Sequence, residues 1–270
     1  MASLIEKYSA LIIDLDGVVY LLNEPVPGSR EAITQIQEKG IPFVFLTNNS
    51  ASTPEQYVGK LVKFGIEIEP SQVVTSSQAV GRYLDLKHEA EGSAAFVIGE
   101  SGLIFELEAR GISIVASSDA KEARFVFVGM DRRFDFEKLK SAVIAIRNGA
   151  EFIATNTDST YPTPDGLWPG AGSIVAAVTT GSGKAPYVAG KPNPLIVEVA
   201  LERMGAEAGE TLLVGDRLET DILAGSEAGV DTMLVLTGIS QVGEIEGRGI
   251  QPTYVGDDLR ALMKPWCPVP

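Results

Sequence analysis

The stretch Ile12-Ile13-Asp14-Leu15-Asp16-Gly17-Val18-Val19 determines how the rest of the chain is interpreted. An apolar run that begins at Ala10 is typical of the end of a buried strand, and two aspartates follow it, one residue apart. Because alternate residues of a strand point to the same side, Asp14 and Asp16 can both face the space beyond the strand's end. Two carboxylates this close repel each other, and a divalent cation or a reaction that gives them different protonation states would relieve the repulsion. A solvated turn would explain the same residues, so the other strands have to decide between the two interpretations.

The composition limits the classes of function that the chain can have. It has 270 residues, 45% of them hydrophobic and 21% charged, which is typical of a globular protein with one large domain or two smaller ones. The net charge of -14 argues against a general surface for nucleic acid or anionic membranes, since both require clustered Lys and Arg. A small anionic ligand held at one local site remains compatible with it.

The chain lacks an apolar run long enough to span a membrane, and the N-terminus has no signal-peptide core, so we expect a cytoplasmic protein. The single cysteine, Cys267, permits no internal disulfide and no thiolate metal site. The single histidine, His88, lies in a polar stretch and is expected on the surface. Catalysis would therefore use carboxylates, lysine, hydroxyls, amides or a hard metal ion.

Strands and helices are expected to alternate along the chain. Ser29 and Asp135 are the expected N-caps of the helices that follow them. Residues 161–172 are expected to form a loop, with Trp168 packed either in the core or in a domain that caps it. Strands are expected at 10–13, 41–46, 94–98, 112–116, 125–129, 151–154, 186–189, 211–214, 232–236 and 253–255, and residues 73–77 are expected to form a short strand and turn. Helices are expected at 31–39, 53–64, 78–86, 103–110, 135–148, 173–180, 195–204 and 222–228. This alternation predicts an α/β fold with a parallel sheet covered on both faces.

Polar residues follow four of the expected strands. Each group alone could be an ordinary turn or a surface residue. Ligands of parallel sheets bind beyond the carboxyl ends of the strands, so the four groups are expected to converge on one edge. The groups are Asp14 with Asp16, Thr47 with Asn48 and Asn49, Lys191, and Asp216 with Asp221.

This set of residue types fits phosphoryl transfer. Asp14 would attack phosphorus and form an aspartyl-phosphate, while Asp16 would protonate the leaving oxygen and then activate water. Thr47 and the amides beside it would hold phosphate oxygens, and Lys191 would neutralise charge on the transferred group. Asp14 and Asp216 would hold Mg²⁺, which also relieves the repulsion between the acids.

At these residues the sequence resembles the haloacid dehalogenase-like hydrolases, with motifs in the same order and no departure at the catalytic positions. Two stretches are similar to the motif sequences of the NagD-like or p-nitrophenylphosphatase subgroup, which includes phosphoglycolate and pyridoxal phosphate phosphatases. They are Leu46-Thr47-Asn48-Asn49-Ser50 and Gly190-Lys191-Pro192-Asn193-Pro194. The wider family's motifs are matched by Asp14-Leu15-Asp16-Gly17, Thr47, Gly190-Lys191-Pro192 and Gly215-Asp216-x₄-Asp221.

The resemblance implies a role for each matching residue. Asp14 would be the nucleophile and Asp16 the acid and base, and an acid at position 16 speaks against a dehalogenase. Mg²⁺ would be bound by the side chains of Asp14 and Asp216 and by the main-chain carbonyl of Asp16, with Asp221 as an outer orienting residue. The phosphate would meet Thr47, Asn48 and Lys191, with Asn49 nearby.

The resemblance also implies a Rossmann-like core with an inserted α/β cap domain: core at 1–80, cap at 81–183 and core again at 184–270. Relatives often pair through the cap, so a homodimer is expected. Asn156, Asp158 and Tyr161 follow the last strand of the expected cap and could contact the substrate or only stabilise a loop.

We therefore expect a Mg²⁺-dependent phosphatase that hydrolyses small phosphorylated metabolites through an aspartyl-phosphate. A phosphotransferase or phosphomutase on the same scaffold is one alternative. The other is a non-catalytic module that binds a phospho-ligand and regulates, similar to a receiver domain, although receiver domains are about half as long and have no inserted cap.

Overall fold

The computed structural model describes residues 3–87, 91–163 and 166–265, so the expectations for His88 and Cys267 lie outside the described residues. The chain forms two compact units. The first unit contains residues 1–47, 55–74 and 191–270, and the second contains 48–54 and 75–190. Among the described helices, none is long and apolar enough to cross a bilayer.

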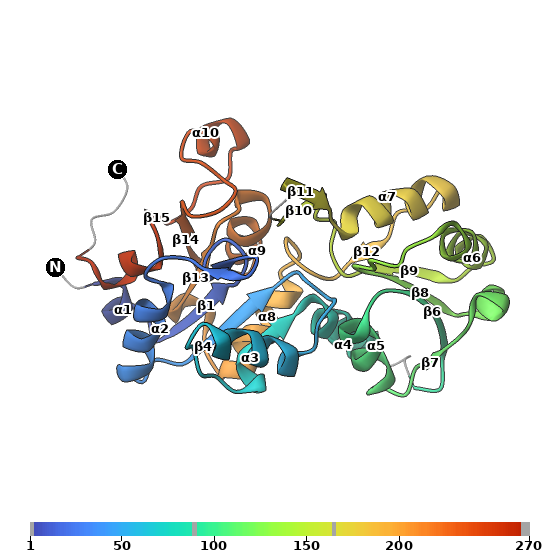
Figure 1. Ribbon diagram of the computed structural model, residues 1–270, viewed down its shortest axis with the longest axis horizontal. Coiled ribbons are helices and arrows are strands. Elements are labelled where there is room, and N and C mark those ends of the chain that lie inside the picture. The colour runs from blue at the N-terminus through green and yellow to red at the C-terminus, as the bar shows by residue number, and fades with distance from the viewer. Residues whose placement is uncertain (1–2, 88–90, 164–165, 266–270) are drawn as a thin grey trace. The chain divides into compact units, whose positions relative to one another are not determined.

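A six-stranded sheet in the order β15-β14-β13-β1-β4-β5 forms the centre of the first unit (Figure 1). β1 lies between β13 and β4 and runs parallel to both, with Ile12 paired to Leu213 and Val44. A short hairpin of β2 (Tyr20–Leu21) and β3 (Glu24–Pro25) follows the first strand. The sheet strands are β1 (Ala10–Asp14), β4 (Phe43–Thr47), β5 (Val73–Thr75), β13 (Thr211–Gly215), β14 (Asp231–Val235) and β15 (Tyr254–Gly256).

Apolar strands place the core of this unit on both faces of its sheet. Ile13 and Phe45 pack against α2 (Ser29–Glu38) and α3 (Pro54–Lys63), while α8 (Leu195–Met204) contacts β1 and β4. Near-continuous burial of both faces is the expected pattern for parallel strands. The remaining helical elements are α1 (Leu4–Lys7), α9 (Leu223–Glu227), α10 (Glu244–Arg248), the π-helical turn Leu218–Ile222, and 3₁₀ turns at Pro70–Gln72, Ala208–Glu210 and Leu259–Met263.

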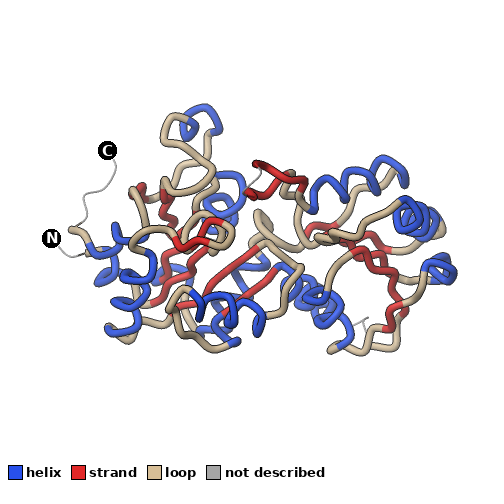
Figure 2. Tube along the Cα trace, in the orientation of Figure 1, coloured by secondary structure: helices blue, strands red, loops and turns tan. Residues whose placement is uncertain are grey.

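The second unit has its own parallel sheet, in the order β12-β9-β8-β6-β7. Helices α6 and α7 pack through Ile146 and Val175 on the face that carries Val126 and Val128, and Figure 1 shows α4 and α5 across this sheet from them. Figure 2 shows the same alternation of strands in red and helices in blue. The strands are β6 (Ala94–Ile98), β7 (Ser113–Ile114), β8 (Phe125–Val128), β9 (Glu151–Ala154) and β12 (Tyr187–Val188). The helices are α4 (Ser76–Lys87), α5 (Ser101–Glu108), α6 (Phe136–Arg147), α7 (Ala171–Ser182) and the 3₁₀ turn Ser117–Glu122.

The α/β class and the N-cap at Asp135, whose side chain accepts from Lys138 N, are confirmed. The expected N-cap at Ser29 is wrong: Gly28, at φ 86°, takes this position, and the Ser29 hydroxyl donates to the carbonyl of Val19 at 2.9 Å. A left-handed conformation at the cap suits glycine, and it frees the serine for the core.

The expected loop at 161–172 is also wrong in part, because β10 (Thr160–Thr163) and β11 (Gly166–Pro169) form an antiparallel hairpin there. Of the two kinds of packing expected for Trp168, burial in a core is absent: Trp168 is 46% exposed and packs edge-on against Tyr161 of the same hairpin. Proline and glycine are typical of loops, yet an isolated two-stranded hairpin tolerates them because half of its backbone groups face away from the partner strand.

The inward face of α2 gives a test of the core. Ile36 is fully buried, whereas its neighbour Gln35 is exposed. We expect Ile36→Ala to reduce the free energy of unfolding by about 2–5 kcal/mol, because it removes buried methylene groups and leaves a cavity. Gln35→Ala, in the same turn, should change it by less than about 0.5 kcal/mol. Urea unfolding followed by circular dichroism measures both, and equal effects would contradict the assigned helix face.

Candidate active site

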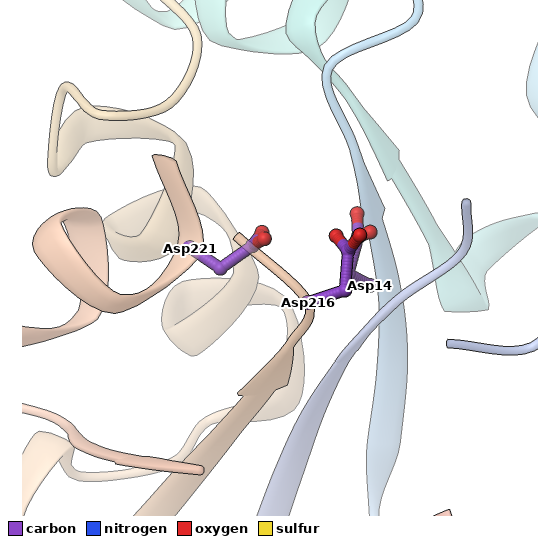
Figure 3. A group of neighbouring side chains, drawn as sticks. All are labelled: Asp14, Asp216 and Asp221. Atoms are coloured by element: carbon purple, nitrogen blue, oxygen red, sulfur yellow. The ribbon is translucent and has the colours of Figure 1, made fainter. Parts of the chain in front are cut away.

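Three buried aspartates meet at the carboxyl ends of β1 and β13. Asp14 is the last residue of β1, Asp216 directly follows β13, and Asp221 lies in the π-helical turn. One carboxylate oxygen from each lies within 4.8 Å of the others. Figure 3 shows the carboxyl groups of Asp14 and Asp216 next to each other, with the side chain of Asp221 directed toward them. The predicted convergence of these strand ends is present within the first unit.

Lys191 connects two of these acids. Its Nζ lies 2.6 Å from Asp14 Oδ1 and 2.6 Å from Asp221 Oδ1, and 3.5 Å from the carbonyl oxygen of Leu46. The lysine is only 3% exposed. A buried ammonium requires such partners, because an isolated charge in a protein interior is costly.

Main-chain groups fix the other carboxylate oxygens. Asp216 Oδ2 accepts from Ile239 N at 2.7 Å, and Asp221 Oδ2 accepts from Arg217 N at 3.1 Å. The backbone beside Asp216 must be glycine, because a Cβ at Gly238 would lie 1.8 Å from Asp216 Oδ2. The acids are therefore held by backbone groups that cannot rotate away.

The electrostatics of the cluster disfavour three free carboxylates. Burial raises the pKa of Asp14 well above its usual range; the charge of Lys191 opposes this shift, and that of Asp221 adds to it. Burial, together with the charge of Asp221, raises the pKa of Asp216 to about 7. Burial alone would lower the pKa of Lys191, but Asp14 and Asp221 outweigh it and raise that pKa.

The residues present fit a divalent cation. When all three acids are ionised, they and Lys191 sum to a charge of −2 (−3 + 1 = −2), which one divalent ion compensates. Both carboxylate oxygens of Asp221 accept hydrogen bonds. Within the described residues, Asp14 and Asp216 each accept hydrogen bonds through only one of their two oxygens. Carboxylate oxygens are the ligands that hard cations prefer.

Asp16 and Thr47 lie beside two buried phenols that the sequence did not reveal. Burial, together with the charge of Asp16, raises the pKa of Tyr20 well above its usual range, and the hydroxyl groups of Tyr57 and Thr47 share a hydrogen bond. Both tyrosines are buried. Tyr57 occupies an inward position of α3, so its place in the apolar pattern masks its polar contact.

Asn48 and Asn49 directly follow Thr47 in the chain but belong to the second unit. Asn48 Nδ2 donates to the Asp158 carboxylate at 3.1 and 3.3 Å, and Asn49 Oδ1 accepts from Ala51 N at 2.9 Å. Asn156 is buried and donates to the carbonyl of Asn48 at 2.7 Å. Two of the three residues that could have met the substrate or stabilised a loop, Asn156 and Asp158, thus have defined partners inside this unit.

Family models match both ends of the chain. A model described as haloacid dehalogenase-like hydrolase matches residues 11–113, and a HAD-hydrolase-like model matches residues 188–262. Acid sugar phosphatase of Staphylococcus aureus is 37% identical over 258 residues, which cover 96% of this chain and 98% of that protein.

Two solved structures share the whole fold. NagD from E. coli K-12 is 36% identical with a TM-score of 0.84, over 94% of this chain and 97% of that one. Glycerol phosphate phosphatase of Mycobacterium tuberculosis, solved in complex with magnesium, is 34% identical with a TM-score of 0.91, over 98% of this chain and 79% of that one. Because these family models and relatives match nearly the whole chain, the chain belongs to the haloacid dehalogenase-like hydrolases and is an enzyme of their NagD-like group of phosphatases.

Proposed function

We propose that the protein is a Mg²⁺-dependent phosphatase that hydrolyses small phosphomonoesters through an aspartyl-phosphate. The observation that carries this proposal is the buried cluster of Asp14, Asp216 and Asp221 around the ammonium of Lys191. The names of the relatives, acid sugar phosphatase and glycerol phosphate phosphatase, support small phosphorylated metabolites as the class of substrate.

Asp14 is the proposed nucleophile. One of its carboxylate oxygens attacks phosphorus, the bond from phosphorus to the ester oxygen breaks, and the phosphoryl group becomes attached to Asp14. The ion pair with Lys191 orients the carboxylate and supports its ionised form at the end of β1. As the phosphoryl group transfers, the same ammonium is available to its developing charge.

Asp16 is the proposed acid and base. It gives its proton to the leaving oxygen in the first step, then takes a proton from the water that attacks the aspartyl-phosphate, which releases inorganic phosphate and restores Asp14. It is more exposed than Asp14, as a group that exchanges protons with the leaving group and water should be. The backbone bridge between Asp16 and Tyr20 supports its position.

The phosphate oxygens are proposed to contact the side chains of Thr47 and Lys191 and the main-chain amides of Asn48 and Asn49, which follow Thr47 in the chain. Mg²⁺ is assigned to the side chains of Asp14 and Asp216 and to the main-chain carbonyl of Asp16. When bound, the ion polarises the phosphoryl group and offsets negative charge. Asp221 is the outer orienting residue, and the engagement of both its oxygens supports this assignment. The charge count of the cluster favours one divalent ion.

We propose that the second unit is the inserted cap domain of the family and that its loops select the leaving group. The expected division into core at 1–80, cap at 81–183 and core at 184–270 belongs to this proposal, as does the homodimer through the cap. The hairpin β10–β11 of the second unit exposes Leu167 and Trp168, apolar groups suited to contacting an organic leaving group. Activity against a panel of sugar, polyol, nucleotide and cofactor phosphates would identify the substrate.

Asp14→Asn should reduce the rate of p-nitrophenyl phosphate hydrolysis by a factor of about a thousand or more, because an amide is a poor nucleophile. Asp257→Asn is the matched control, since its side chain is 84% exposed on the same unit and should leave activity unchanged. Circular dichroism of both purified variants at the assay temperature should match the wild type, which shows that loss of activity does not come from loss of the fold. Substantial activity in purified Asp14→Asn would refute the nucleophile assignment.

The loss of rate caused by Asp16→Asn should depend on the leaving group. Loss of a general acid costs about 10²–10⁴ in rate where the leaving oxygen requires a proton. Formation of the aspartyl-phosphate should therefore slow more with an alkyl phosphate such as glycerol phosphate than with p-nitrophenyl phosphate, whose phenolate leaves without help. Acid-quenched single turnovers measure this step, and an equal loss for both substrates would remove the proton-donor role.

Chelation should stop hydrolysis, and added Mg²⁺ should restore it. Asp216→Asn removes a charged ligand, so the Mg²⁺ concentration for half-maximal activity should rise by at least about tenfold, while Asp257→Asn should leave it unchanged. Activity that survives chelation would contradict the metal site. Phosphate binding without turnover at any Mg²⁺ concentration would favour the regulatory module, and transfer to an added alcohol in place of phosphate release would favour the transferase.

A further inference from the structure

The chain passes between the two units at four places, after residues 47, 54, 74 and 190. On the second-unit side, three of these passages meet in one polar cluster, in which every residue is buried except the half-buried Asp158. We call it the passage cluster and define it as Asn48, Ser76, Thr155, Asn156, Asp158 and Gly190. Thr47 directly precedes this cluster and Lys191 directly follows it in the chain.

The side chain of Asn48 is committed inside this cluster. Its Nδ2 faces both oxygens of Asp158, at 3.1 and 3.3 Å. A carboxylate only accepts hydrogen bonds, so the amide nitrogen has to lie on this side. Its Oδ1 lies against Gly190, where a Cβ would stand 2.6 Å from that oxygen. Asn48 is 7% exposed.

The main chain of Asn48 is held as firmly as its side chain. Its carbonyl oxygen accepts from Ser76 Oγ at 2.6 Å and from Asn156 Nδ2 at 2.7 Å. Asn156 Oδ1 in turn accepts from the main-chain N–H of Asp158 at 3.1 Å, and Gly190 N donates to the carbonyl of Thr155 at 2.8 Å. Hydrogen-bonded polar networks of this kind favour one conformation.

We infer that the side chain of Asn48 is a tether and not a phosphate ligand, and that Asp158 is the positioning residue that holds it. This inference rests on the proposed function and deepens it. Asp158 acts through Asn48 on the peptide that joins it to Thr47, and so on the orientation of the Thr47 hydroxyl and of the adjacent main-chain amides. Misplacing such groups by about 1 Å costs about a hundredfold in rate.

Exchanging the two side chains separates a tether from a ligand. Asn48→Asp alone sets a buried carboxylate against the half-buried carboxylate of Asp158 and should reduce kcat/KM for p-nitrophenyl phosphate by about a hundredfold. Asp158→Asn alone keeps an oxygen that accepts from Asn48 and should cost less than about tenfold. The double variant restores a carboxylate–amide pair in reverse order, so it should be at least tenfold more active than Asn48→Asp alone.

A smaller recovery in the double variant would overturn the inference, because a carboxylate at position 48 would then be harmful in itself, as it would be next to a bound phosphate. Near-normal activity of Asn48→Asp would also overturn it. If the position-48 variants do not fold, Asp158→Leu and Asp158→Asn decide: both remove the charge, but only Leu removes the acceptor. A loss at least about tenfold larger for Leu supports the tether, and a smaller difference refutes it.

Thr157→Ala is the control, since Thr157 is exposed between Asn156 and Asp158 and should leave activity and melting temperature unchanged. Thermal melting of every variant separates misfolding from misplacement. The wild type and Asp14→Asn test the proposed function separately: an inactive wild type would refute that function, whereas an active wild type with no recovery in the exchange variant would refute only the tether.

Discussion

The ammonium of Lys191 is the group on which the first unit depends, because it lies between two buried carboxylates and compensates part of their charge. Removing one member of a buried ion pair costs more than a surface pair is worth, since the remaining charge stays buried. The lysine and the acids come from separate stretches of the chain. The sheet is therefore the means of bringing opposite charges to one point.

The sheet achieves this through strand order. β1 lies at its centre between β4 and β13, so the ends of these three strands carry Asp14, Thr47 and Asp216. Glycine then allows the backbone to approach the acids closely: a side chain at Gly215 or Gly238 would overlap Asp221 or Asp216. Apolar strands set the positions of the acids, and the glycines leave space for them.

Much of this arrangement could be predicted from the sequence, because it depends on patterns that are local. The buried strand before Asp14, the Asp135 cap and the helix at Leu195–Met204 each follow from a few adjacent residues. The bond between Asn48 and Asp158 joins residues 110 positions apart and has no periodic signal.

The roles of Tyr20 and Tyr57 were hidden for a different reason. A buried tyrosine fills an apolar position of the pattern while its hydroxyl reaches a polar partner. Trp168 shows the opposite case, since a large aromatic residue suggests burial in a core, but this one is half-exposed on a hairpin and packs against Tyr161.

The discontinuity of the first unit has a consequence for the order in which the protein is made. β1 pairs with β13 across 201 positions (211 − 10 = 201), whereas all but residues 48–54 of the second unit form one continuous stretch. Contacts this distant in sequence close late, because a long loop has to be ordered first. A nascent chain that has not reached Lys191 carries Asp14 without its counter-charge, and the central strand without one neighbour. Synthesis therefore completes the second unit before Lys191, Asp216 and Asp221 can join Asp14 in the first.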